Sequence, residues 1–90
     1  MVKIICNINT FDLYQTINLV DTEHNVAKTI GKCELEKLNT DIVAACAKYA
    51  VGKVVLFGNK SFISPLADEI KVLGKTKYGI NNIEVEVCSK

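Results

Sequence analysis

The sequence predicts a single-domain α/β protein built around one five-stranded mixed sheet. Ninety residues are enough for one domain, and 49% of them are hydrophobic, which supplies an adequate core. Hydrophobic residues recur at every second position in some segments and at every third or fourth in others, which indicates both strands and helices. The segments follow the order strand, strand, strand, helix, strand, helix, strand (βββαβαβ), so residues 1–90 are expected to form one α/β domain.

Residues 2–9 and residues 12–20 each alternate between apolar and polar positions, which predicts two strands. The cluster from Asp21 to Asn25 is rich in turn-forming residues, and a short segment from Val26 to Ile30 follows it. Two strands joined by such a five-residue loop predict a β-hairpin that ends at Gly31. The inward face of its first strand is expected to consist of Leu13, Ile17 and Leu19.

Apolar residues recur at intervals of three and four from Leu35 to Tyr49, which predicts an amphipathic helix. We expect this helix to stop at Gly52, because glycine is the commonest residue just after a helix end. The segment from Lys53 to Phe57 is continuously β-branched, aliphatic or aromatic after its lysine. This pattern is typical of a central parallel strand that is covered on both faces.

A second helix is predicted to begin at Ser64, with Pro65 in the first helical position, where the missing N–H of proline costs nothing. Gly74 is its expected stop, and residues 75–79 form a polar connection. Residues 83–87 alternate strictly and predict a last strand that turns two glutamates to water. Right-handed crossovers then predict the strand order 3-2-1-4-5, with the hairpin antiparallel and the first, fourth and fifth strands parallel.

Composition argues against several classes of function. The net charge is +1, which gives no field to attract nucleic acid or an anionic membrane. All 11 basic residues are lysines, so the planar side chain that grips guanine edges and phosphates in two places is missing. No segment resembles a membrane span or a signal peptide, so we expect a cytoplasmic protein without membrane contact. Abundant lysine and asparagine are typical of AT-rich genomes, such as those of low-GC bacteria and their phages.

The residues with reactive side chains predict neither a metal site nor catalysis. The four cysteines form no CxxC pair, and the single histidine, His24, sits beside no acidic or thiol cluster of metal-ligand spacing. We expect four reduced, mostly structural thiols, with Cys6 and Cys46 on core faces. Ser61 and Ser64 lie near the functional edge of a parallel sheet, but His24 has no clear route to Ser61 to act as its base. We therefore expect no enzyme, no metal and no cofactor.

The segment VVLFGNKS, residues 54–61, contains the candidate ligand site. A strand that ends in glycine and leads to a helix can bind an anion through backbone N–H groups, with Lys60 as the counter-charge. The segment has one glycine and matches neither GxxxxGK[ST] nor GxGxxG, so a simple tight turn is the competing interpretation. The candidate anion- or ligand-binding residues at this edge are Asn7, Asn9, Gly58, Asn59, Lys60 and Ser61.

The predicted element order resembles the ribonuclease H-like fold, as in RuvC-type resolvases and their small relatives. In that superfamily, acidic residues on the first strand, near the end of the fourth strand and on a later helix hold two divalent metals for phosphodiester cleavage. Here Asn7 or Asn9 stands at the first position and Gly58 with Asn59 at the second, and Asp12 is the only nearby acid. The later helix is expected to be missing because the chain ends at residue 90. The resemblance therefore implies the scaffold without the nuclease.

The strands at residues 26–30 and 83–87 are predicted to be the edges of the sheet, and unpaired edges promote association. With only two helices, part of the sheet is expected to remain uncovered. We expect a small non-enzymatic protein, with a phage among its candidate sources, that binds a protein partner or forms a homo-oligomer. The alternative is a degenerate ribonuclease H-like domain that binds nucleic acid or a nucleotide weakly at the C-terminal edge of its parallel strands. The predicted contact residues are Tyr14, Thr16, Val26, Lys28 and Ile30.

Overall fold

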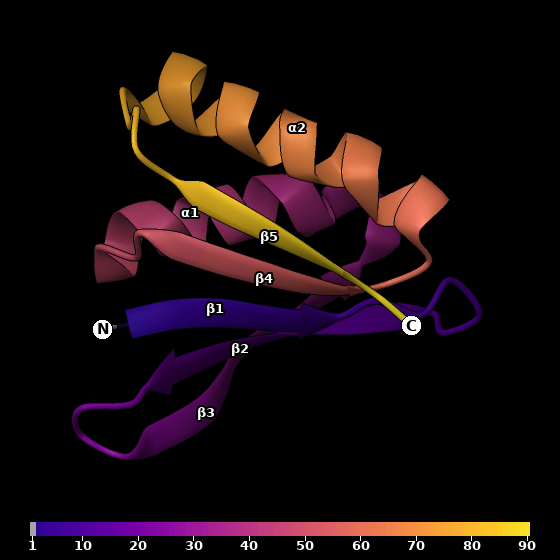
Figure 1. The fold of residues 1–90 in the computed structure, drawn as a ribbon, viewed down its shortest axis with the longest axis horizontal. Helices are drawn as coiled ribbons and strands as arrows, with labels where there is room; N and C mark the ends of the chain where they lie inside the picture. The colour runs from indigo at the N-terminus through magenta and orange to yellow at the C-terminus, as the bar shows by residue number, and fades with distance from the viewer. Residues whose placement is uncertain (1) are drawn as a thin grey trace.

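The computed structural model describes residues 2–90, and it contains one five-stranded mixed sheet with both helices on the same face (Figure 1). The strands are β1 (Val2–Asn7), β2 (Tyr14–Asp21), β3 (Val26–Glu34), β4 (Lys53–Gly58) and β5 (Glu84–Ser89). The helices are the short 3-10 helix η1 (Leu35–Lys37), α1 (Leu38–Tyr49) and α2 (Lys60–Tyr78).

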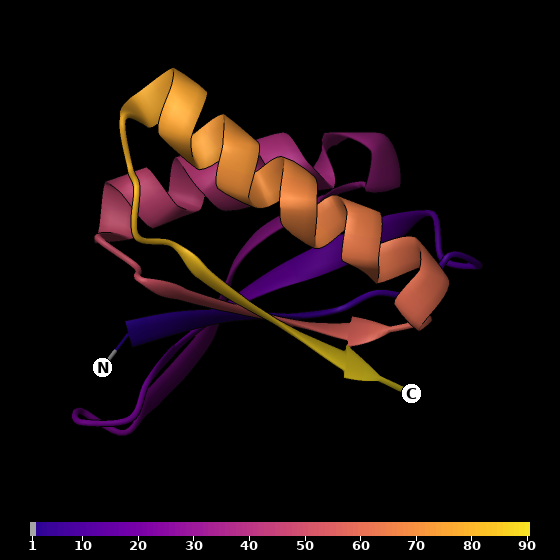
Figure 2. The same ribbon diagram turned by 45° about the horizontal axis from the view of Figure 1, so that its top comes forward.

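The strand order is β3-β2-β1-β4-β5, which confirms the predicted α/β fold and its sheet order. β2 pairs antiparallel with both β1 and β3, whereas β4 runs parallel to both β1 and β5. β4 is connected to β5 through α2, and β1 is connected to β4 through the β2–β3 hairpin, η1 and α1, with both long helices on the same side of the sheet (Figure 2). This arrangement is consistent with a ribonuclease H-like topology.

The hairpin differs from the prediction at both of its strands. β3 does not end at Gly31 but continues to Glu34, because a bulge lets the pairing pass the glycine. In β2, Ile17 pairs with Gly31 and Asn18 pairs with Thr29, so one extra residue of β3 is accommodated between them. The hairpin edge is therefore nine residues long, nearly twice the predicted length.

The first helix also begins and ends elsewhere than predicted. Residues 35–37 form the 3-10 turn, and α1 starts at Leu38. α1 ends at Tyr49 because Ala50 adopts the left-handed conformation, with φ of 54°, and donates its N–H to the carbonyl of Cys46. The predicted stop at Gly52 was wrong, since an alanine provides the left-handed cap two residues earlier.

The start of α2 corrects the predicted cap at Ser64. The helix begins at Lys60, and Asn59 is its N-cap, because the Asn59 side chain accepts a hydrogen bond from the N–H of Ser61. Pro65 consequently lies inside the helix, where it has no N–H to donate to the carbonyl four residues earlier. The VVLFGNKS segment thus passes from strand to helix with no intervening loop beyond its cap residue.

The end of α2 corrects the predicted stop at Gly74. A Cβ at Gly74 would lie 2.6 Å from Cδ1 of Ile83, so this glycine allows close packing of the helix on the chain that enters β5. The helix continues to Tyr78 and ends at Gly79, whose φ of 68° is left-handed. Residues 75–78 are therefore helical rather than a loop. Within residues 2–90, no helix has the length and apolar character needed to cross a membrane.

The hydrophobic core lies between the helices and the sheet, and three of the four cysteines belong to it. All four cysteines are free thiols, and Cys6, Cys33 and Cys46 are buried. Burial raises the pKa of the Cys6 thiol to about 12 and that of Cys46 to about 11. These thiols stay protonated at neutral pH and pack as small hydrophobic side chains, as predicted for Cys6 and Cys46.

Candidate functional site

The loop between β1 and β2 is held by one buried side chain, Gln15, which is only 2% exposed. Its Oε1 accepts a hydrogen bond from the N–H of Asn9 at 2.9 Å, and its Nε2 donates to the carbonyls of Asn9 and Asp12 at 2.8 and 3.1 Å. The loop leaves Phe11 and Leu13 in solvent, at 96% and 73% exposure. The prediction that Leu13 faces the core was wrong, because β2 begins after it and Gln15 takes the inward position.

The carboxyl ends of β1 and β4 meet beside this loop. A Cβ at Gly58 would lie 2.8 Å from the carbonyl oxygen of Ile8, a backbone atom that cannot yield easily, so the site requires glycine. The carbonyl of Gly58 accepts a hydrogen bond from the N–H of Lys90 at 3.0 Å. A hollow of about 240 Å³ opens here, and its lining includes Asn9, Gly58, Asn59 and Lys90.

The first N–H groups of α2 are already bonded to Asn59. Its Oδ1 accepts from the N–H of Ser61 at 3.0 Å and from the Ser61 hydroxyl at 2.5 Å. Its carbonyl accepts from the N–H groups of Phe62 and Ile63 at 3.0 and 2.9 Å. An anion would have to displace the Asn59 side chain to reach the N–H of Ser61, and the N–H groups of Phe62 and Ile63 would still be bonded to the Asn59 carbonyl. The geometry therefore favours the tight-turn interpretation of VVLFGNKS.

The six candidate ligand residues are therefore only partly brought together. Asn9, Gly58 and Asn59 line the hollow at the sheet edge, whereas Asn7 and Lys60 do not line it. Ser61 contributes to a different hollow, between the helices.

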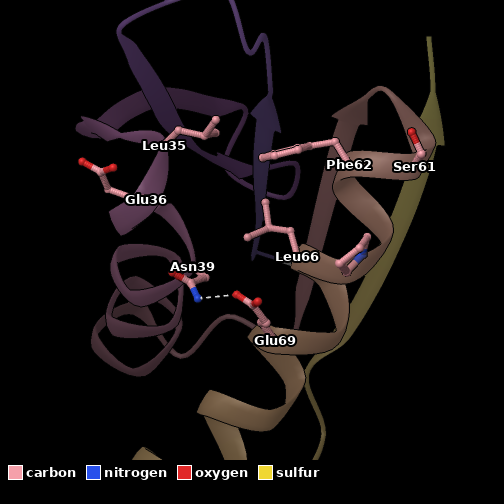
Figure 3. Close-up of a pocket in the computed structure, with 8 residues that line it drawn as sticks. Leu35, Glu36, Asn39, Ser61, Phe62, Leu66 and Glu69 are labelled. Atoms are coloured by element: carbon pink, nitrogen blue, oxygen red, sulfur yellow. Dashed lines mark hydrogen bonds between the residues drawn. The ribbon is translucent and has the colours of Figure 1, made fainter.

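That second hollow lies between the first half of α2 and the start of α1, and its volume is about 510 Å³ (Figure 3). Phe62 and Leu66 reach from α2 towards Leu35, and they form an apolar floor. A hydrogen bond of 2.7 Å from Asn39 Nδ2 to Glu69 Oε2 joins the two helices beside this floor.

Two further hollows of about 370 Å³ each continue this depression at its two ends. One shares Leu35 and Glu36 with the central hollow and extends to Phe11 in the β1–β2 loop. The other shares Asn39 and Glu69 and extends along α2. We call the three hollows together the helix groove. Sequence reasoning missed it, because its walls come from three segments that are distant along the chain.

The charges that line the helix groove are all negative. Its three hollows contain no lysine and five of the ten acidic residues of the chain, which are Asp12, Glu34, Glu36, Asp68 and Glu69. The neighbouring carboxyl of Glu34 raises the pKa of Glu36, through a hydrogen bond and through charge repulsion. The chain has a net charge of +1, so the groove is a local negative region on a nearly neutral molecule.

The face of the sheet opposite the helices is covered by no element within residues 2–90 (Figure 2). Its centre is apolar, since Ile5 of β1 pairs with Val55 of β4, and Phe57 lies one row further along β4. Ile5 and Phe57 are half-buried there, and Val55 is buried by its neighbours on the sheet. Its ends are charged or polar. We call this surface the uncovered face, and it consists of Lys3, Ile5, Asn7, Tyr14, Thr16, Asn18, Val20, Ala27, Thr29, Lys32, Lys53, Val55, Phe57, Glu84, Glu86 and Cys88.

The structure divides the five predicted contact residues between the two faces of the hairpin. Tyr14 and Thr16 lie on the uncovered side, where the Nζ of a neighbouring lysine is 5.7 Å from the centre of the Tyr14 ring. Val26 and Lys28 lie on the helix side of β3, since Lys28 pairs with a core residue of β2. Ile30 packs against the core on that same side. Only the first two could belong to a contact made by the uncovered face.

The hairpin turn gives His24 acidic neighbours that its place in the sequence did not indicate. It brings Asp21, Glu23 and His24 together, with one potential metal-ligand atom from each within 4.8 Å of the others. The carboxyl of Asp21 is 2.7 Å from Nδ1 of His24, and this hydrogen bond lowers the pKa of Asp21. His24 therefore does have acidic neighbours. Exposed groupings of this kind are common without an ion, and we assign no metal to it.

No model of a known protein family matches this chain, and no curated protein matches it either.

Proposed function

We propose that this chain is a small, non-catalytic α/β protein that acts by binding proteins, and that a second copy of the chain binds to its uncovered face. The main support is that both helices lie on one face, while β1 and β4 present Ile5, Val55 and Phe57 on the other. All-parallel sheets are almost always covered on both faces, and β1, β4 and β5 form the parallel part of this mixed sheet. A covering partner is therefore expected.

The charges around the uncovered face support a second copy as that partner. Lys3 and Lys53 lie in one row across the sheet, and Glu84 of β5 completes that row. A two-fold axis parallel to β4 and passing over it would place Lys3 of one copy opposite Glu84 of the other, while Lys53, which already pairs with Glu86 of its own chain at 3.6 Å, would lie opposite Lys53 of the other copy. Such a contact is self-complementary and closes after two subunits, as in most soluble homo-oligomers.

We also infer a ribonuclease H-like scaffold without the catalytic carboxylates, and the support is the sheet order. At the edge where that superfamily holds its metals, Asn9, Gly58 and Asn59 offer neutral oxygens, and the side-chain oxygen of Asn59 already accepts two hydrogen bonds. Two divalent metals need clustered carboxylates. Binding of nucleic acid at this edge would need the N–H groups that Asn59 occupies, so we favour the protein-binding function.

Light scattering over a concentration series tests the proposed dimer. We expect the mass of a dimer for the natural chain, and the mass of a monomer for the variant Phe57→Glu, which places a charge beside the apolar centre of the uncovered face. The matched control is Val72→Glu, since Val72 is 59% exposed on α2, on the opposite side of the sheet. This control should remain dimeric.

Circular dichroism of each variant shows whether it is folded. A natural chain that stays monomeric up to about 1 mM, a concentration at which association as weak as about 4 kcal/mol is detectable, contradicts the proposal. A folded Phe57→Glu variant that remains dimeric contradicts the choice of surface.

A further inference from the structure

We propose that the helix groove is a docking site for a basic amphipathic helix of another protein. The groove lies on the helical side of the sheet, away from the uncovered face (Figures 1 and 2). The two surfaces are therefore separate, and a protein that is already dimeric through its sheet still presents the groove.

The shape of the groove suits a helix. Its floor is formed by Leu35, Phe62 and Leu66, which lie between two existing helices (Figure 3). From Phe62 to Leu73 the groove follows α2 for roughly 17 Å, at 1.5 Å per residue, which matches about three turns of an incoming helix. A third helix can place its apolar stripe on such a floor, as amphipathic helices do in other hydrophobic grooves.

Phe11 extends this apolar surface at one end of the groove. Its ring is 96% exposed, although the loop that holds it is fixed by the hydrogen bonds of Gln15. An aromatic side chain held in solvent by an ordered loop is a suitable anchor for a partner, because little conformational freedom is lost when the partner covers it.

The charge of the groove determines the chemistry of the partner. Five carboxylates and no lysine line its three hollows, so lysine or arginine on the polar face of an incoming helix would meet opposite charge throughout.

The same charges disfavour other occupants. A second copy bound groove to groove would bring two sets of five carboxylates together, and like charges across an interface are strongly unfavourable. Nucleic acid and phosphate ligands would be repelled for the same reason. A positively charged, amphipathic protein segment is the occupant that fits both the floor and the rim.

A titration with a synthetic peptide tests the docking site. The probe is a helix of about fourteen residues, made of leucine and lysine, with the leucines at i, i+3, i+4 and i+7 so that they share one face. It is added to ¹⁵N-labelled protein, and the amide shifts are followed by NMR. We expect saturable shifts in the β1–β2 loop, in residues 34–39 and in the part of α2 between Phe62 and Leu73.

Four variants identify the interactions. Glu36→Lys reverses a charge on the groove, and its matched control Glu23→Lys makes the same change in the hairpin turn. Phe11→Ala removes the exposed aromatic anchor, and its matched control Val26→Ala removes an exposed apolar side chain from β3. We expect Glu36→Lys to weaken binding about tenfold and Phe11→Ala at least about threefold, while each control stays within about twofold.

Several results would contradict the proposal that the helix groove is a docking site. They are the absence of shifts at about 1 mM peptide, shifts that map outside the groove, and equal weakening by Glu23→Lys and Glu36→Lys. Equal binding of a peptide with the same composition but with leucines scattered around the helix would overturn it as well. The monomeric Phe57→Glu variant is expected to bind the peptide as the natural chain does, so failure of the dimer proposal and failure of the groove proposal are distinguishable.

Discussion

Replacing Gln15 with methionine tests how the β1–β2 loop is held. Methionine preserves the length and volume of the glutamine side chain but removes its amide. Gln15 is 2% exposed and makes three hydrogen bonds, one from the N–H of Asn9 and two to the carbonyls of Asn9 and Asp12. All three bonds are lost in the variant. The N–H of Asn9 and the carbonyl of Asp12 lose their Gln15 partner, whereas the carbonyl of Asn9 still accepts a hydrogen bond from the N–H of Asp12 at 3.1 Å.

The expected loss of stability follows from these three bonds. Each contributes about 0.5–1.5 kcal/mol to the free energy of unfolding, which gives about 1.5–4.5 kcal/mol in total. Water can reach part of this loop and replace some of the lost partners, so we expect a net loss of about 2–3 kcal/mol. For a domain of this size, that corresponds to a decrease in Tm of roughly 10–20 °C.

Urea unfolding followed by circular dichroism measures this free energy. The matched comparison is Asn9→Ala, which removes one exposed bond, from the N–H of Phe11 to Asn9 Oδ1, and should cost less than about 1 kcal/mol. A cost below about 0.5 kcal/mol for Gln15→Met would show that the buried amide of Gln15 does not hold the β1–β2 loop, because it would then contribute almost nothing to stability. Peptide binding to the groove should weaken with it, since the loop that presents Phe11 is loosened.

Three further predictions concern single positions. Gly58→Ala should lower the free energy of unfolding by about 1–3 kcal/mol, since its Cβ would contact a backbone carbonyl oxygen. The control Gly52→Ala should change this free energy by less than about 1 kcal/mol, because no atom lies within 4 Å of the added Cβ. Ala50→Gly should raise the melting temperature, because glycine adopts the left-handed cap without the strain of about 1 kcal/mol that alanine has there; an unchanged or lower value in a thermal scan would argue against this. The pKa of Asp21, followed by carboxyl NMR, should lie below its ordinary value and rise in His24→Ala, because the bond to His24 lowers it. The stability from that bond is present above the ordinary carboxyl pKa and disappears as the pH falls through the lowered one; a pKa that is equal in the two proteins would contradict the role of the bond.

The sheet was predictable because its signals are local. Alternation marks β1, β2 and β5, and the continuous apolar segment marks β4 as a central strand. The order of the strands then follows from the right-handed crossover rule, which leaves few alternatives for this sequence of elements.

The limits of α2 were not predictable from its strongest local signals. Ser64 with Pro65 is a common helix start, and Gly74 is a common helix stop, yet tertiary packing overrides both. One signal did point to the longer helix, since Ile63 lies in phase with Leu66 and extends the buried stripe to the other side of the proline.

The candidate site was less predictable than the fold. Asn59 followed by Ser61 could have been identified as a helix cap, and this would have weakened the anion-site hypothesis earlier. The helix groove could not have been found in this way. Phe11, Leu35 and Phe62 come from three segments, and their proximity depends on packing that no local pattern encodes.

The most direct test of the central claim is an NMR measurement of intermolecular NOEs in a sample that mixes labelled and unlabelled chains at about 1 mM, where even weak association is populated. We predict NOEs between subunits that involve the ring of Phe57 and the methyl groups of Ile5, Val20 or Val55, all on the uncovered face, and none that involve Val72 on α2. If no intermolecular NOEs appear, or if they involve only residues outside the uncovered face, a second copy does not bind to this face as proposed.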